Sequence, residues 1–100
     1  MTLHQILLLS QCRFGRHFLK KSYSLELLLY FVENKQADGI EDLLRSLKST
    51  TPRLPAFLAY ISLLEAKGCV TKTRTEFKES KRTIMLTTEC ENAIRRLLQT

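Results

Sequence analysis

Basic residues gather in one short stretch of the chain, between positions 74 and 82. The four cations are Arg74, Lys78, Lys81 and Arg82. Their charged groups can neutralise the phosphates of a nucleic acid and release its condensed counterions. A guanidinium is also favoured in a narrow minor groove, where the negative potential is enhanced. The alternative is a charged hairpin tip that protects the edge of a sheet from pairing with another chain.

The distribution of charge over the whole chain favours the same kind of partner. The formal net charge is +6 over 100 residues. Residues 1–24 carry four basic residues and no acidic one, whereas residues 69–87 carry five basic and two acidic residues. Two basic zones around a nearly neutral middle indicate a polyanionic partner. A merely solvated charged surface is the alternative.

A second group of candidate contacts lies at the start of, and along, a predicted helix from Leu54. The hydroxyl groups of Thr50 and Thr51 could bond phosphate oxygens, or they could serve only the turn. Arg53 could reach a base edge or a phosphate. The predicted solvent face of the helix adds four candidates, Ala56, Ala59, Tyr60 and Ser62. Tyr60 could instead belong to the edge of the core. Because this face is poor in long polar side chains, readout through DNA shape is an option.

The sequence offers little for catalysis, metal binding or disulfide formation. The cysteines at positions 12, 69 and 90 form an odd and widely spaced set, which favours a reducing compartment. Basic neighbours of Cys12 favour a thiolate, but a tolerated thiol is the more frequent case. We find no metal-ligand spacing, no nucleophile and base pair and no phosphate-binding glycine loop. We therefore predict no enzyme, no cofactor and no metal.

Apolar residues at helical spacing predict the elements that position these candidates. Three successive stripes are Leu25, Leu28, Leu29 and Val32, then Ile40, Leu43, Leu44 and Leu47, and finally Leu54, Phe57, Leu58 and Ile61. Ser24, Asp38 and Thr88 are predicted N-caps, and Gly68 is predicted to follow a helix end. Strands are predicted over 70–75 and 83–87 with a loop over 76–82, and a final helix closes the chain.

The N-terminal helix has an apolar face that is wide for a lone surface helix. Leu3, Ile6, Leu7 and Phe14 are therefore predicted to pack against a second subunit or against the domain body. A chain of 100 residues supports one domain with a thin core, so help from a partner subunit is expected. We predict a helical dimerisation segment over residues 1–20 and one folded domain over residues 21–100.

Two segments resemble a known family of regulators. Residues 64–72 (LEAKGCVTK) are similar to the end of a winged-helix recognition helix and its first strand. Residues 80–87 (SKRTIMLT) resemble the wing and second strand of MarR-like proteins. The resemblance covers about residues 24–99. Ser80 stands where the family usually has an acidic residue, and Cys90 stands where it usually has glycine.

The resemblance implies an α+β, mainly α fold, the winged helix-turn-helix, with a three-helix core, a two-stranded wing and flanking terminal helices. It implies a homodimer that binds double-stranded DNA and regulates transcription. The recognition helix would enter the major groove and the wing the minor groove. A prokaryotic cytoplasmic, nucleoid-associated location follows, and no stretch has the length of a membrane span. The alternative is a protein-interaction winged helix, and an unknown small-molecule effector or protein partner stays open.

Overall fold

Helices make up most of the chain, and a small antiparallel sheet lies among them. The computed structural model describes residues 1–48, 50–75 and 78–99, and it describes side chains outside residues 74–82. The elements in chain order are α1 (Leu3–Gln11), the 3-10 helix η1 (Gly15–Leu19), α2 (Ser24–Asn34), β1 (Gln36–Ala37), α3 (Ile40–Ser46), α4 (Leu54–Ala66), β2 (Val70–Thr75), β3 (Lys78–Leu86) and α5 (Thr88–Leu98). The predicted α+β, mainly helical class is confirmed.

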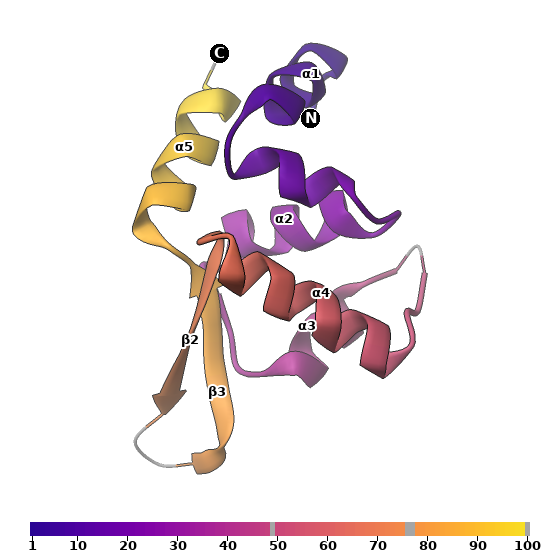
Figure 1. Cartoon of the computed structure of the whole chain (residues 1–100), viewed down its shortest axis with the longest axis vertical. Coiled ribbons are helices and arrows are strands. Elements are labelled where there is room, and N and C mark those ends of the chain that lie inside the picture. Colours follow the sequence, from indigo (N-terminus) through magenta and orange to yellow (C-terminus); the bar gives the residue numbers. More distant parts are fainter. Residues whose placement is uncertain (49, 76–77, 100) are drawn as a thin grey trace.

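The molecule is elongated, and the hairpin of β2 and β3 extends from one end (Figure 1). α1 and α5 lie at the other end, and α2, α3 and α4 lie between. The principal extents are 41 × 27 × 22 Å. β3 is the central strand of the sheet, with β1 on one side and β2 on the other. The two-residue β1, whose Ala37 pairs with Ile84, was not predicted, because two residues cannot show a strand period.

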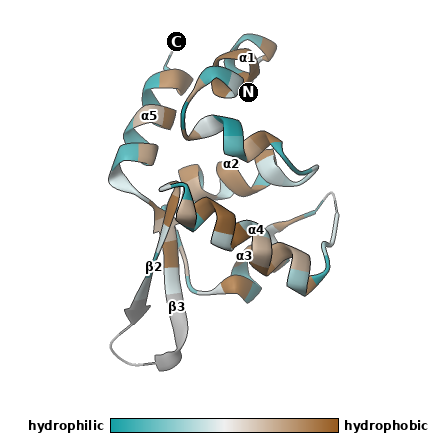
Figure 2. Cartoon of the chain, in the orientation of Figure 1, coloured by the Kyte–Doolittle hydropathy of each residue, from teal (hydrophilic) through white to brown (hydrophobic). Residues whose placement is uncertain are grey.

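One hydrophobic core joins the helices to the inner part of the sheet. Its largest fully buried side chains include Phe18, Phe31, Phe57, Leu27, Leu43, Ile61, Ile84 and Ile94. Figure 2 shows that hydrophobic residues run along α4 in the middle of the molecule. Leu9, Phe14 and Phe18 belong to the same buried cluster. The first 20 residues are therefore packed into the domain rather than standing apart from it.

Two of the three predicted apolar stripes are confirmed only in part. On α2, Leu28 is buried as predicted, but Leu29 is 38 % exposed, and Leu27 and Phe31 are buried as well. On α4, Phe57 and Ile61 are buried as predicted, whereas Leu54 and Leu58 are 50 % and 40 % exposed. Both helices carry more apolar residues than one stripe needs, so several rotations satisfy the helical spacing. The third stripe is confirmed, because Leu43 on α3 and its C-cap Leu47 are buried.

All three predicted N-caps are wrong by one residue, since Tyr23 also precedes α2 in place of Ser24. Gly39, with a φ of 134°, precedes α3 in place of Asp38. Thr87 rather than Thr88 caps α5, and its hydroxyl oxygen accepts a hydrogen bond from the backbone N–H of Cys90 at 3.2 Å. Adjacent residues of similar capping propensity cannot be separated by type alone.

The predicted loop over residues 76–82 is mostly wrong, because β3 begins at Lys78. The register pairs Arg74 with Arg82 and Thr75 with Lys78, with an irregularity between positions 74 and 75. Polar composition favours a loop, but the backbone here forms paired strands that extend past the helices (Figure 1). Residues 76 and 77 lie outside the described residues.

Candidate nucleic-acid interface

α4 is the helix that the sequence predicts to contact DNA, and 13 residues form it. Arg53 is its N-cap, and Pro55 lies in the first turn, where the missing N–H breaks no intrahelical hydrogen bond. Gly68 follows the helix with a φ of 76°, which confirms its predicted role. At 1.5 Å per residue, the helix is ~20 Å long. Lys67 is the C-cap, so a basic residue stands at each end.

The side of α4 that faces away from the core carries almost no charge. Ala56, Ala59 and Ser62 are exposed, as predicted. The half-exposed Leu54 and Leu58 join them. Small side chains allow another surface to approach closely, and alanine can contact the methyl group of thymine. The arrangement therefore favours contact by shape more than by hydrogen bonds to base edges.

Tyr60 does not lie on this exposed face, and its predicted DNA contact is wrong. The side chain is only 3 % exposed. Its hydroxyl group donates to the carbonyl oxygen of His17 and shares a 2.9 Å hydrogen bond with the hydroxyl group of Ser24. Burial raises the pKa of Tyr60 to about 12. These bonds make Tyr60 a buried link between α4, η1 and α2.

Ser24 also departs from its predicted role. Tyr23 is the N-cap of α2, and Ser24 is the first residue of the helix. Its hydroxyl oxygen accepts a hydrogen bond from the backbone N–H of Lys21 at 2.9 Å. Ser24 therefore serves the packing between η1 and α4 instead of a conventional cap.

Thr50 and Thr51, whose hydroxyl groups are predicted to contact DNA, lie near the surface in the segment before α4. Thr51 is exposed and Thr50 is half-buried. The N-cap residue of α4 makes no side-chain capping hydrogen bond. The segment is held instead from α2, because the carboxylate of Glu26 accepts a hydrogen bond from the backbone N–H of Lys48 at 2.7 Å.

The four basic hairpin residues predicted to contact DNA are placed only by their backbones. Arg74 lies in β2, and Lys78, Lys81 and Arg82 lie in β3. Their side chains lie outside the described residues. Lys72, nearer the core, is described, and its ammonium group lies 4.0 Å from the carboxylate of Glu65 on α4. This ion pair joins the base of the hairpin to α4.

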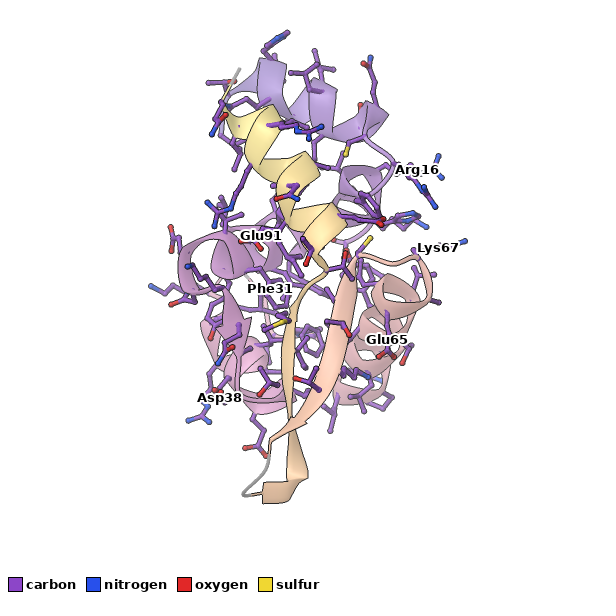
Figure 3. The ribbon with its side chains drawn as sticks, turned by 90° about the vertical axis from the view of Figure 1, so that its left-hand side faces the viewer. Arg16, Phe31, Asp38, Glu65, Lys67 and Glu91 are labelled. Atoms are coloured by element: carbon purple, nitrogen blue, oxygen red, sulfur yellow. The ribbon has the colours of Figure 1, made fainter. Side chains whose placement is uncertain are left out.

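The N-terminal segment places a further set of basic residues against the end of α4, which the predicted site did not include. The carbonyl oxygen of Phe14 accepts a hydrogen bond from the thiol of Cys69, just after α4, at a donor–acceptor distance of 3.6 Å. Arg16 and Lys67 lie on the side of the molecule where α4 is found (Figure 3). The sequence shows this basic segment, but it does not show that the segment packs against residues 55 positions later in the chain.

The predicted dimerisation residues divide into two groups. Leu3 and Leu7 are 74 % and 56 % exposed, and Ile6 is half-buried. Phe14 is only 9 % exposed and belongs to the core of its own domain, so its predicted role in dimerisation is wrong. The guanidinium of Arg13 lies 5.5 Å from the centre of its ring.

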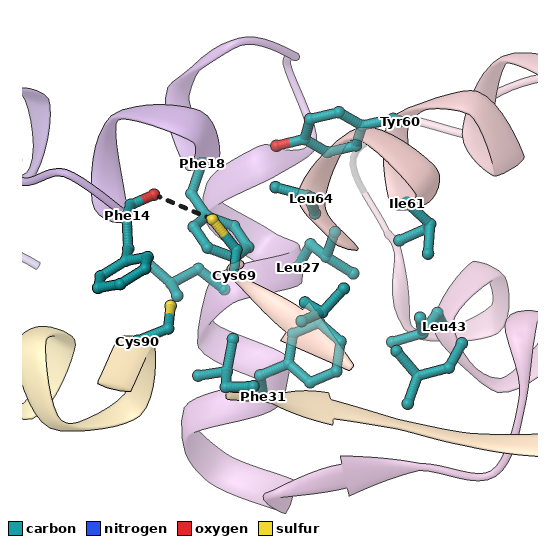
Figure 4. Close-up of a cluster of buried hydrophobic side chains, with 14 of the residues drawn as sticks. Phe14, Phe18, Leu27, Phe31, Leu43, Tyr60, Ile61, Leu64, Cys69 and Cys90 are labelled. Carbon is teal, nitrogen blue, oxygen red and sulfur yellow. Dashed lines mark hydrogen bonds between the residues drawn. The ribbon is translucent and has the colours of Figure 1, made fainter. Parts of the chain in front are cut away.

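The buried thiols of Cys69 and Cys90 lie near Phe14 in the core (Figure 4). A hydrogen bond with Cys69, followed by burial, raises the pKa of Cys90, and the same bond lowers the pKa of Cys69. Cys12 is half-buried. Within the described parts of the chain, no group of His, Cys, Asp and Glu side chains could hold a metal ion.

Comparisons with family models, curated proteins and solved structures find no match for this chain. The resemblance to MarR-like regulators therefore stays a prediction. Over the described ranges, no helix is long and apolar enough to cross a membrane.

Proposed function

We propose that this protein binds double-stranded DNA through α4 and the β2–β3 hairpin, as a winged helix-turn-helix regulator of transcription. The order α2, β1, α3, α4, β2 and β3 supports this fold. A short segment connects α3 to α4, and the hairpin follows α4 directly. α4 would enter the major groove, and the hairpin would reach the neighbouring minor groove.

One observation carries the proposal: a hairpin rich in cations extends from the body next to an exposed helix. Its register places two arginines, Arg74 and Arg82, at one cross-strand position. Like charges at such a position are unfavourable in an isolated sheet. Phosphates offset this cost, and the net charge of +6 favours the approach of a polyanion.

The exposed face of α4 supports weak sequence discrimination. Arg53 and Ser62 are its polar contacts among the predicted residues, and the remaining contacts are short or apolar side chains. Specific base reading usually depends on Arg, Lys, Asn or Gln in bidentate geometry. Backbone contacts and DNA shape would therefore supply most of the affinity.

We also propose a homodimer formed through α1. Leu3 and Leu7 expose more than half of their surface, and α1 contains no Asp, Glu, Lys or Arg. An uncharged helix with exposed leucines is suited to packing against a second copy. A dimer would present two α4 helices to two half-sites of one duplex. A prokaryotic cytoplasmic location, associated with the nucleoid, would follow.

Fluorescence anisotropy with a labelled duplex tests the proposal over a series of salt concentrations. Lys81→Ala should lower the slope of log affinity against log salt by ~1 unit. Arg82→Ala should cost ~1–3 kcal/mol, and more on a duplex with A·T-rich flanks. Arg96→Ala, an exposed cation on α5, is the matched control and should change little.

A protein-interaction module is the second candidate, and the exposed Leu54 and Leu58 favour it. Apolar side chains on an exposed helix face are typical of a protein contact. The same titration separates the two candidates. A wild-type protein that fails to bind random duplex at low salt, or a Lys81→Ala/Arg82→Ala variant with unchanged affinity and slope, would favour the protein partner.

A further inference from the structure

We infer that Arg16, Lys20 and Lys67 form a second phosphate-contacting surface, where η1 meets the C-terminal end of α4. The inference rests on the proposed function, because the partner is the phosphate backbone of the same DNA duplex. It extends the contact beyond the hairpin to the N-terminal segment of the chain.

Two buried hydrogen bonds fix η1 against α4 and the turn that follows it. The hydroxyl group of Tyr60 donates to the carbonyl oxygen of His17. The thiol of Cys69 donates to the carbonyl oxygen of Phe14 at 3.6 Å. Gly68 lies close to the same segment, since a methyl group there would lie 3.7 Å from the Phe14 ring. η1 therefore presents its cations from a fixed position.

The cations around η1 have no acidic counterpart among the described residues. Arg16, Lys20 and Lys67 are all exposed. The ion pairs found in the described parts of the chain are Arg45 with Asp42, Lys72 with Glu65, and Arg95 with Glu91. Figure 3 shows Arg16 and Lys67 on one side of the molecule, with Glu91 and Asp38 toward the other, and the acidic residue labelled near Lys67, Glu65, is paired with Lys72. Uncompensated like charges on one surface favour an anionic partner.

His17 lies near these cations, and their positive charges affect its pKa. Its side chain is 5 % exposed, and its Nδ1 atom has no hydrogen-bond partner among the described residues. Burial and then the charges of Lys20, Arg16 and Lys67 lower the pKa of His17. A phosphate at this surface would offset the positive field and raise that pKa.

The position of the surface relative to α4 favours a DNA backbone. Arg53 and Lys67 stand at opposite ends of a helix whose exposed face is otherwise almost uncharged. The helix is ~20 Å long, and the major groove is ~12 Å wide. Because the helix is longer than the groove is wide, a helix that crosses the groove brings Lys67, at its C-terminal end, toward the phosphates of one side.

The test compares two triple variants that remove equal charge. Arg16→Gln/Lys20→Gln/Lys67→Gln removes the proposed surface, and Lys35→Gln/Arg45→Gln/Arg96→Gln removes three exposed cations elsewhere. Duplex affinity is measured by anisotropy over a salt series. Because each phosphate contact contributes ~0.9 to the salt slope, the first variant should lower the slope by about 2 to 3 units. The control should change it by less than about half a unit. Circular dichroism confirms that both variants fold.

Equal slopes for the two triple variants would overturn the inference while leaving the proposed function intact. If the wild-type protein binds no duplex, the proposed function fails, and NMR titration of His17 then decides whether Arg16, Lys20 and Lys67 contact phosphate at all. Its pKa is compared in inorganic phosphate and in chloride at equal ionic strength. A rise in phosphate that the first triple variant lacks supports the surface, and no rise overturns it.

Discussion

Tyr60→Phe should destabilise the domain, because Tyr60 is buried and not part of the exposed face of α4. The change removes one hydroxyl group and leaves the ring, which packs edge-on against Tyr23 at a centroid distance of 5.8 Å. Two buried hydrogen bonds disappear, one to His17 and one to Ser24. At ~0.5–1.5 kcal/mol for each bond, and with polar partners left unpaired, the expected loss is ~2–3 kcal/mol. Urea denaturation at neutral pH measures it.

The pH dependence gives the same residue a second test. The pKa of Tyr60 is raised to about 12 in the folded state, against about 10 in the unfolded chain. The folded state therefore binds the Tyr60 proton more tightly than the unfolded chain does. The contribution of this difference to the free energy of unfolding is complete below pH ~10 and is lost as pH rises toward ~12. The advantage of wild type over Tyr60→Phe should shrink by ~2 kcal/mol between pH ~9 and ~11.5.

Ser24→Ala provides the comparison variant, because it removes the hydrogen bond to Tyr60, together with the one from the Lys21 N–H, and leaves the bond from Tyr60 to His17. In a double-mutant cycle, the coupling between positions 24 and 60 should be ~0.5–1.5 kcal/mol. Two results together would refute the buried link between α4 and η1. Tyr60→Phe would lower the free energy of unfolding by less than about 0.5 kcal/mol, and the difference between wild type and Tyr60→Phe would not change at alkaline pH.

Three further predictions concern the core, η1 and α1. Ile61→Ala should cost ~2–5 kcal/mol in urea melts, because this α4 side chain is fully buried, and a loss below ~1 kcal/mol would contradict its placement. Gly15→Ala should cost ~1–3 kcal/mol, since its new methyl group would lie 2.9 Å from the Leu9 carbonyl oxygen, and an unchanged melt would disprove this crowding. Light scattering should show a wild-type dimer and a monomeric Leu3→Asp/Leu7→Asp variant, and a wild-type monomer at micromolar concentration would exclude dimerisation through α1.

Local sequence signals predicted most elements of the fold. The i, i+3, i+4 spacing located α3, and Gly68 located the end of α4, because both signals act within a few residues. The alternation of Thr with basic residues located β2. The rotation of α2 and α4 could not be predicted in this way. Their apolar residues exceed one stripe, so contacts with distant parts of the chain select the buried side.

Long-range contacts also explain why part of the candidate site was assigned incorrectly. Tyr60 fits an exposed position by residue type, and it is buried because the carbonyl oxygen of His17, 43 residues earlier, accepts its hydrogen bond. Phe14 fits a dimer contact for a similar reason, and it is buried beside Cys69, 55 residues later. The predicted exposure of Ala56 and Ser62 is confirmed. No local pattern encodes the pairing of η1 with the end of α4.

The nearly uncharged face of α4 and the basic groups around it would act together in the proposed mode of DNA binding. If the protein binds duplex as proposed, the cations supply affinity and position the helix through phosphates, which carry no direct sequence information. The short side chains of Ala56 and Ala59 then let the helix approach closely without a polar group that demands one base. Among the predicted contacts of α4, Arg53 would then be the long polar side chain at the major groove. Arg53→Ala should therefore reduce discrimination between duplexes more than overall affinity, whereas changes at Lys81 should do the opposite. Competition anisotropy with a selected and a random duplex separates the two effects, and equal loss on both duplexes for Arg53→Ala would assign Arg53 to a phosphate instead.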